Sequence, residues 1–330
     1  MSAASAVFLA GCAGIDNPLA NASGSSSRHP DILRQQIFLD SENFGPGVVD
    51  GRLGEFTRKA MVNYRQAKSL PADWMPDTGN IAGHTVYRIT SKDLSLIGAN
   101  AEEPGDQAKQ SKMPYTTPIE ILSERFHTTE KYLRSLNPGI DINSAPPGAS
   151  ITVPNVSRPF DYHAYPSSYR PPSSATAKAR HVSVGLREKI LSIHENGRLI
   201  ATFPITPGSA EHPAPAGEWR ITGAVPFPWF RYDLGVLKRG ERTDDFHTLP
   251  PGPNNPVGIL WAGLNRPGIA IPRQPRPRTQ RPRRKPWLHP PFELGCRHFL
   301  HAGRERHRRH HPVNCVHLFC PRHERGDSAE

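Results

Sequence analysis

The stretch His181–Ile205, HVSVGLREKILSIHENGRLIATFPI, decides the fold of the second half of the chain. Apolar residues alternate with polar or small residues on both sides of Asn196-Gly197, which is the period of a half-buried β-strand. Both central residues of a type I′ turn need positive φ, so Asn-Gly predicts a two-residue hairpin turn there. The returning strand is expected from Leu199 to Ile205, and residues 181–271 are predicted to form a β-rich head.

Turn-forming and aromatic residues continue through this head in a fixed order. They are Pro204, Gly208, Pro213, Pro215, Gly217, Trp219, Ile221, Asn255-Pro256-Val257-Gly258, Trp261 and Gly268-Ile269-Ala270-Ile271. This series resembles the L,D-transpeptidase (YkuD-like) catalytic domain. The resemblance implies a β-sandwich-like domain in which a cysteine transfers peptidoglycan acyl groups, assisted by a histidine and without metal or other cofactor. It also suggests His212 and Trp261 as candidate substrate-binding residues.

The family's catalytic motif, Ser-His-Gly-Cys-Ile/Val-Arg, is missing from the chain. Where the family has His-Gly after the strand ending at Ile271, this sequence has Pro272-Arg273, and none of the later cysteines follows a His-Gly pair. We therefore expect an incomplete transpeptidase domain and an inactive chain.

Codon arithmetic accounts for the loss. If one extra base precedes the codon of Pro272, each original codon consists of the last two bases of a present codon and the first base of the next. Pro272 and Arg273 then permit His-Gly. The following positions permit Ser-His-Gly-Cys-Ile-Arg, with the motif lying under Lys285, Pro286, Trp287, Leu288, His289 and Pro290. The sequence therefore predicts a frameshift after Ile271.

The composition of residues 272–330 agrees with an out-of-frame reading. This tail holds 14 of the 41 Lys and Arg residues but 5 of the 30 Asp and Glu, so it carries +9 of the net charge of +11. Two alternatives are a disordered tail that binds nucleic acid and a zinc site formed by Cys315, Cys320 and His323. We expect no nucleic-acid partner and no metal, and a tail that is disordered or poorly packed.

Residues 31–70 are predicted to form a helical hairpin. Apolar residues at Leu33 and Ile37, and again at Ala60, Met61 and Tyr64, recur at helical spacing, with Arg65 expected on the outer face. The connecting turn and second helix carry Pro46, Gly47, Asp50, Gly51, Gly54, Thr57 and Ala60, which resemble the peptidoglycan-binding domain 1 family. An unrelated helical hairpin is the alternative.

Residues 85–156 are predicted to contain two short helices closed by a strand at Ser150–Pro154. A helix stop at Asn137-Pro138-Gly139 and the Ile-x-Val-Pro ending resemble a degenerate LysM domain, a glycan-binding fold. Tyr87-Arg88-Ile89 is the candidate first strand, and a purely structural domain is the alternative. Residues 157–180, rich in Pro, Ser and Tyr, are expected to be a linker that lets the head range away from these modules.

The amino end contains an apolar run ending in Leu9-Ala10-Gly11-Cys12, which resembles a bacterial lipoprotein signal. We expect a signal at residues 1–12, lipidation of Cys12 and a tether at 13–30. The whole chain is then predicted to be a multidomain α+β protein anchored by lipid at the periplasmic face of a membrane, expected to be the outer one. Its partner would be peptidoglycan. The alternative function is a non-catalytic peptidoglycan-binding lipoprotein.

Overall fold

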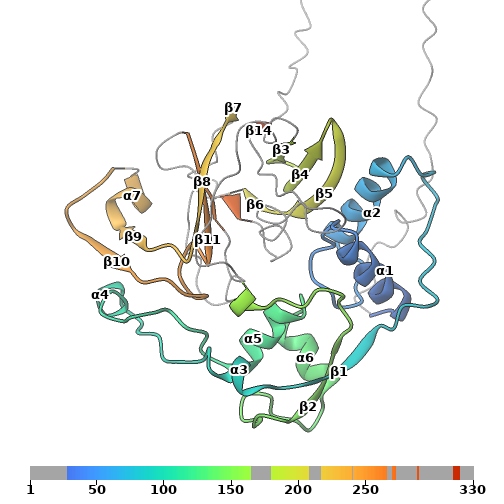
Figure 1. Cartoon of the computed structure of the whole chain (residues 1–330), viewed down its shortest axis with the longest axis horizontal. Helices are drawn as coiled ribbons and strands as arrows, with labels where there is room; N and C mark the ends of the chain where they lie inside the picture. The colour runs from blue at the N-terminus through green and yellow to red at the C-terminus, as the bar shows by residue number, and fades with distance from the viewer. Residues whose placement is uncertain are drawn as a thin grey trace, which may run out of the picture.

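The structure is a computed structural model that describes residues 28–164, 180–207, 217–239, 241–265, 270–272, 288–289 and 315–319. Cys12, within the expected signal, and the tether up to residue 27 lie outside these ranges. Figure 1 shows three groups of elements: helices α1 and α2 at one side, helices α3, α5 and α6 with strands β1 and β2 below, and the strands of the head above. Among the described residues no helix is long and apolar enough to cross a membrane.

The first group is the predicted helical hairpin, α1 (Pro30–Ser41) and α2 (Glu55–Ala67). Gln36 ties the connecting turn to α1, because its side-chain oxygen accepts the Asp50 and Gly51 amides at 3.0 and 2.8 Å. The positive φ of +76° at Gly51 suits a glycine there. Arg65 is not on the outer face as expected: it is 5% exposed and donates to the carbonyl of Trp74 at 2.7 Å, so its charge is buried by the chain that follows α2.

The second group is a βααβ arrangement with an insertion. Its strands β1 (His84–Arg88) and β2 (Ser150–Pro154) pair antiparallel, with Tyr87 opposite Ile151. The first strand thus begins three residues before the candidate and ends one residue before it, sharing Tyr87 and Arg88, and the closing strand has the predicted bounds. Between them are α3 (Ser91–Leu94), α4 (Pro104–Gln107), α5 (Pro118–Arg125) and α6 (Glu130–Leu136).

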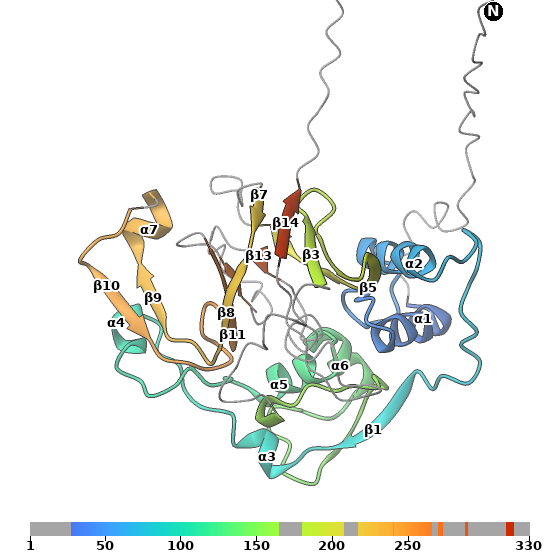
Figure 2. The same cartoon turned by 45° about the horizontal axis from the view of Figure 1, so that its top comes forward.

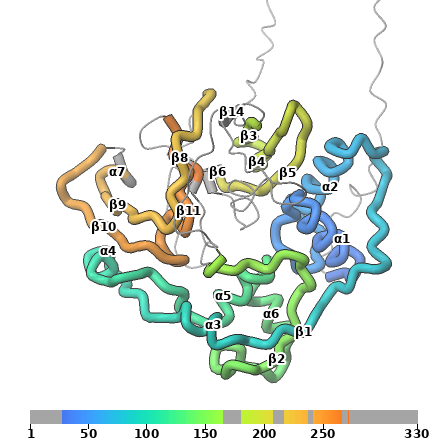
Figure 3. Tube along the Cα trace, in the orientation of Figure 1, coloured from blue at the N-terminus to red at the C-terminus, as the bar shows by residue number. Residues whose placement is uncertain are grey.

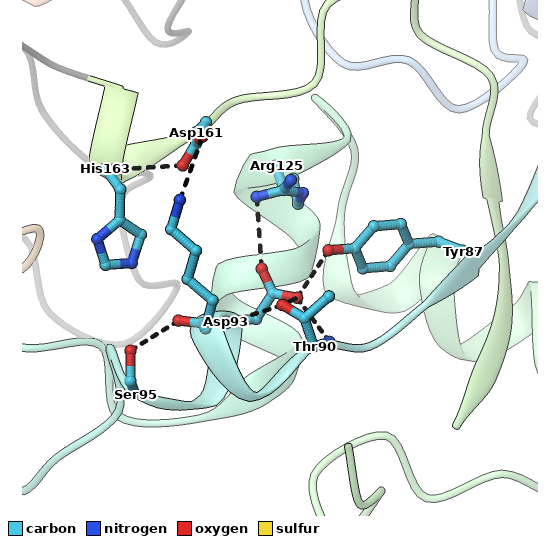
Figure 4. A network of polar contacts seen from close by, with 8 residues as sticks. Tyr87, Thr90, Asp93, Ser95, Arg125, Asp161 and His163 are labelled. Carbon is cyan, nitrogen blue, oxygen red and sulfur yellow. Dashed lines mark hydrogen bonds and ion pairs between the residues drawn. The ribbon is translucent and has the colours of Figure 1, made fainter. Parts of the chain in front are cut away.

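A buried carboxylate joins β1, α3 and α5 (Figure 4). Asp93 accepts hydrogen bonds from the Tyr87 hydroxyl at 2.7 Å and from the backbone and side chain of Thr90 at 2.9 and 2.7 Å, and it pairs with Arg125 at 3.4 Å. Burial, followed by the hydrogen bond to Asp93, raises the pKa of Tyr87 to about 12. The same network fixes the N-terminus of α3 through a capping box formed by Thr90 and Asp93.

The head is β-rich and contains the predicted hairpin, and most of its strands pair antiparallel. Both residues of the Asn196-Gly197 turn have positive φ, +51° and +76°, and the hairpin they close is β4 and β5. The strands of the head are β3 (Arg180–Gly185), β4 (Ile190–Glu195), β5 (Arg198–Pro204), β6 (Thr206–Pro207), β7 (Gly217–Trp219), β8 (Ile221–Pro226), β9 (Phe230–Asp233), β10 (Phe246–Leu249), β11 (Leu260–Leu264), β12 (Ala270–Pro272), β13 (Leu288–His289) and β14 (Cys315–Phe319). Helix α7 (Leu234–Arg239) connects β9 to β10.

Two sheets share the core of the head. One has the order β5-β4-β3-β14-β7 and the other β12-β11-β8. Side chains of both sheets form one buried cluster that includes Val184, Ile193 and Phe203 from the first sheet and Ala262 and Ile271 from the second. This packing of sheet on sheet agrees with the β-sandwich-like fold that was expected.

The tail contributes two short strands to this head. β14 pairs parallel with β3, Val316 opposite Val182, and antiparallel with β7, as Figure 2 shows, while β13 pairs with β6. The expectation for residues 272–330 did not include this backbone pairing. The remainder of that range lies outside the described residues, so the expectation of a disordered tail stays a prediction there.

The three groups contact one another through their backbones, contrary to the expectation of a freely ranging head. The turn after α1 reaches the edge strand β5, where Gly45 donates to the Thr202 carbonyl at 2.7 Å and Thr202 donates to the Asn43 carbonyl at 3.0 Å. Arg158 donates to the carbonyls of Asp40 and Ser41 at 2.9 Å and also to the Asn43 side chain. The tube in Figure 3 shows α1 and α2 beside β5.

The first part of the expected linker, residues 157–164, packs against the rest of the protein. Phe160 is 3% exposed and packs against Ile259 and Leu260 of the head. Its amide donates to the Arg125 carbonyl of α5 at 2.9 Å. Phe160 thus contacts the head through its side chain and α5 through its amide, so residues 157–164 belong to the folded part of the protein. Residues 165–179 lie outside the described part of the chain.

Candidate functional site

The Asn255-Pro256-Val257-Gly258 stretch forms a braced loop just before β11. Asn255 is fully buried, and its side-chain amide donates to the carbonyls of Pro250 and Pro228 at 2.8 and 3.3 Å. Its side-chain oxygen accepts the Val257 amide at 3.0 Å. Gly258 has a φ of +69°, which a glycine adopts without strain. These residues therefore set the direction in which the chain enters β11, and none of them is free to act on a substrate.

Trp261, the candidate substrate-binding residue on β11, is half-buried at the border of this loop. In register it lies between Val225 of β8 and Pro272 of β12. It packs against a buried cluster of Met113, Phe230, Leu249 and Val257. Its side chain is therefore part of the border of the core and remains partly accessible.

The insertion between α3 and α5 forms part of this site, which sequence reasoning did not foresee. Residues 98–115 cross from the βααβ group to the head, and we call them the strap. Met113 donates its amide to the Pro251 carbonyl at 2.9 Å and accepts the Asn254 amide at 3.1 Å. The Asn254 side chain also donates to the Pro114 carbonyl at 2.7 Å. The amino-acid sequence of the insertion did not indicate this contact with the head, because the hydrogen bonds that join the two are made mostly by backbone atoms.

The hairpin of β9, α7 and β10 stands beside the strap and is held by a second buried carboxylate. Asp233, 1% exposed, accepts the amides of Gly235, Val236 and Thr243 at 2.9, 3.2 and 2.9 Å, and the Thr243 hydroxyl at 2.8 Å. The hydrogen bonds from Thr243 in particular hold the pKa of Asp233 far below its usual range. In the sequence, Asp233 is a single aspartate next to a turn, so these hydrogen bonds could not be predicted from it.

Two of the positions that carry the missing motif in the shifted frame, Pro272 and Leu288, fall in described strands. Pro272, under which the His codon would lie, ends β12 and pairs with Trp261. Leu288, under which the Cys codon would lie, is in β13 opposite Pro207 of β6, and β12 and β13 are in contact. The side chains of Pro272 and Leu288 are not described. His212, Arg273, Lys285, Pro286, Trp287 and Pro290 lie outside the described residues, so His212 stays a predicted partner of this site.

The described residues contain no cluster of three or more His, Cys, Asp or Glu side chains that would suit a metal ion. Of the zinc ligands considered above, only Cys315 falls in a described strand, and its side chain is not described.

Comparison with known proteins points to one enzyme family. The chain is 27% identical over 141 residues to the putative L,D-transpeptidase YkuD of Bacillus licheniformis, which covers 43% of this chain and 73% of that protein. No protein-family model matches the chain.

Solved structures give the same family name at low similarity. The catalytic domain of an L,D-transpeptidase from E. faecium is 16% identical, covering 42% of this chain and 96% of that one, with a TM-score of 0.29. The C442S mutant of Enterococcus faecium L,D-transpeptidase is 15% identical with a TM-score of 0.29, and the match spans half of that chain and 43% of this one. L,D-transpeptidase 1 of Mycobacterium tuberculosis is 11% identical with a TM-score of 0.28, covering 43% of this chain and 62% of that one. TM-scores below 0.3 do not establish a shared fold.

Proposed function

Because the chain is related to the YkuD-like L,D-transpeptidases, we propose that it derives from an enzyme that cross-links or remodels peptidoglycan by cysteine acyl transfer. The chain as printed is inactive in this proposal, since the Ser-His-Gly-Cys motif is missing. The observation that carries the proposal is the braced Asn255–Gly258 loop leading into β11 and β12, at whose end the sequence departs from the family.

In this proposal, restoring the reading frame returns the catalytic cysteine and histidine to the chain. A cysteine in the position of Leu288 would attack the acyl carbon of a wall peptide and release an amine, and the acyl group would pass to a second amine. A thiolate is the reactive form, so a nearby histidine acting as base would raise the rate. The contact between β12 and β13 supports this, because it brings the two shifted positions, 272 and 288, into one region.

Two measurements test the proposal. Resequencing the DNA that encodes Leu264 to His289 should show one base fewer before the codon of Pro272. A protein made from the corrected frame should then change the cross-links of purified peptidoglycan sacculi, while the chain as printed leaves them unchanged. A corrected protein that leaves all cross-links unchanged contradicts the enzymatic proposal.

A non-catalytic wall-binding lipoprotein is the second candidate. It is favoured by the fact that the α1–α2 hairpin and the βααβ group are completely built in a chain without the catalytic motif. Lipidation at Cys12 would hold the protein at the periplasmic face of a membrane, next to its proposed partner. Pull-down of the printed chain with sacculi should then show binding, and the protein should partition into detergent when Cys12 is present but not in a Cys12→Ser variant.

A further inference from the structure

Two histidines face each other across the strands β3 and β4 of the head. His181 and His194 are in register, and their imidazole rings stack with centroids 4.5 Å apart and planes 2° apart. The adjacent residues Val182 and Ile193 are fully buried in the core between the two sheets. Because side chains alternate along a strand, both imidazoles lie on the opposite, outer face of the sheet. The two rings therefore form a cluster that the core of the head does not use.

The outer face of the sheet is partly covered at this point. Leu199 of β5, which is in register with His194, packs against the buried apolar cluster of the α1–α2 hairpin, and Figure 1 shows that hairpin beside β5. Both histidines are half-buried, and the Nδ1 atom of His194 is buried without a hydrogen-bond partner among the described residues. Buried polar atoms without a partner are rare in proteins. This nitrogen therefore indicates a ligand that the described chain does not itself supply.

The charges around the pair suit neutral imidazole rings. Burial, followed by the proximity of His181, lowers the pKa of His194. At the ends of the same two strands, Arg180 and Glu195 pair with each other through a hydrogen bond of 2.7 Å. Arg198 is exposed and lies in register with Glu195 rather than with either histidine. Neutral imidazole is the form of histidine that binds a metal ion.

We propose that His181 and His194 together bind a divalent transition-metal ion on the outer face of the head, with water in the remaining coordination positions. Opposite residues on paired strands have Cβ atoms about 4.5–5.5 Å apart, and zinc–imidazole bonds are about 2.0–2.1 Å long. One ion can therefore lie between the two rings after each ring turns about χ2. Imidazole nitrogens suit zinc, copper and nickel.

The proposed ion is structural, so this inference goes beyond the proposed function and does not depend on it. On the other side of His181, Cys315 takes the neighbouring register position in β14. The side chain of Cys315 is not described, and the proposal rests on the two histidines alone.

The test uses the full printed chain, with isotope-labelled histidines, and zinc chloride as the probe. The Cε1–Hε1 NMR signals of His181 and His194 are assigned from their loss in His181→Gln and His194→Gln. We expect both signals to move over the same range of zinc concentration, because one ion contacts both rings. Each signal is observed separately, so zinc bound to other histidines does not obscure the result. Movement of only one of the two signals, or of neither, overturns the proposal.

The single variants test whether the two rings act together. In His181→Gln the affinity measured at His194 should fall at least about ten-fold, a loss that removal of even a supporting residue causes in metal sites. His84→Gln is the matched control, because His84 also lies in a paired strand but its Nε2 atom is 2.9 Å from the Tyr132 hydroxyl. The control should leave both responses unchanged. An equal loss in His84→Gln would mean diffuse binding and would overturn the proposal.

A further variant separates the two histidines from the neighbouring thiol. Cys315→Ser should leave the movement of both histidine signals in place. Loss of both movements in this variant would assign the ion to the thiol and overturn the two-histidine site. Circular dichroism of each variant checks that the fold is retained.

Discussion

Replacement of Gly252 by alanine should separate the strap from the head. A Cβ atom at this position would lie 2.6 Å from the Met113 carbonyl carbon and closer still to its oxygen. These are backbone atoms, so no side chain can move aside to relieve the overlap. The φ of +151° at Gly252 is also one that residues with a side chain rarely adopt.

The magnitude follows from the contacts at the junction. Three hydrogen bonds cross it: Met113 to Pro251, Asn254 to Met113 and the Asn254 side chain to Pro114. At about 1 kcal/mol net for each, their loss costs about 3 kcal/mol. The backbone conformation at residue 252 adds about 1 kcal/mol. We therefore expect Gly252→Ala to lower the free energy of unfolding by about 3–4 kcal/mol.

Urea unfolding followed by circular dichroism measures the total effect, and hydrogen exchange at the amides of Met113 and Asn254 reports on the junction itself. Gly223→Ala is the control, because no atom lies within 4 Å of a Cβ built at Gly223 in β8. The control should change stability by less than about 0.5 kcal/mol. Unchanged stability and unchanged exchange in Gly252→Ala would refute the junction as described.

Three further predictions concern the buried carboxylates and the core. Asp93→Asn should lower the pKa of Tyr87 from about 12, which spectrophotometric titration detects. Since folding raises this pKa, the contribution of Tyr87 to stability is complete below about pH 10 and is lost as the pH rises towards 12; a flat unfolding free energy over that window would contradict this. Asp233, whose pKa folding lowers, should stabilise the hairpin at neutral pH and lose that contribution gradually in acid. Because its pKa in the folded protein lies far below the usual range, Asp233→Asn should speed hydrogen exchange at Thr243 at pH 7 and by a smaller factor at pH 2, where part of the contribution remains. Ile193→Ala, which removes a fully buried side chain between the two sheets, should cost about 2–5 kcal/mol in urea unfolding, and a smaller loss would argue against a shared core.

Local patterns in the sequence were sufficient to predict most elements. The Asn196-Gly197 turn, the closing strand Ser150–Pro154 and the two helices of the hairpin follow from short-range rules on turns and periodicity, and the structure has them within a few residues. Such rules act within one element, so they succeed where an element depends on its own residues.

Contacts between distant segments could not be predicted in the same way. Arg65 looks like a surface residue on a helical face, and only the fold of the following chain brings a carbonyl, that of Trp74, to its side chain. Met113 and Gly252 are ordinary loop residues in the sequence, and their junction depends on a register set by two separate modules. His212 and Trp261 became candidates only through the family resemblance, and of the two the structure describes Trp261 alone.

The docking of the turn after α1 on β5 determines how a mechanical load enters the molecule. A pull on the chain ahead of α1 reaches the head first through the two backbone hydrogen bonds between residues 43–45 and Thr202. Arg158 offers a parallel path, because its guanidinium bonds the carbonyls at the end of the same helix. Tension is therefore shared between the edge of the head and the βααβ group. The contact between the turn after α1 and β5, which rests on these two hydrogen bonds, is the place where the molecule should yield first under force.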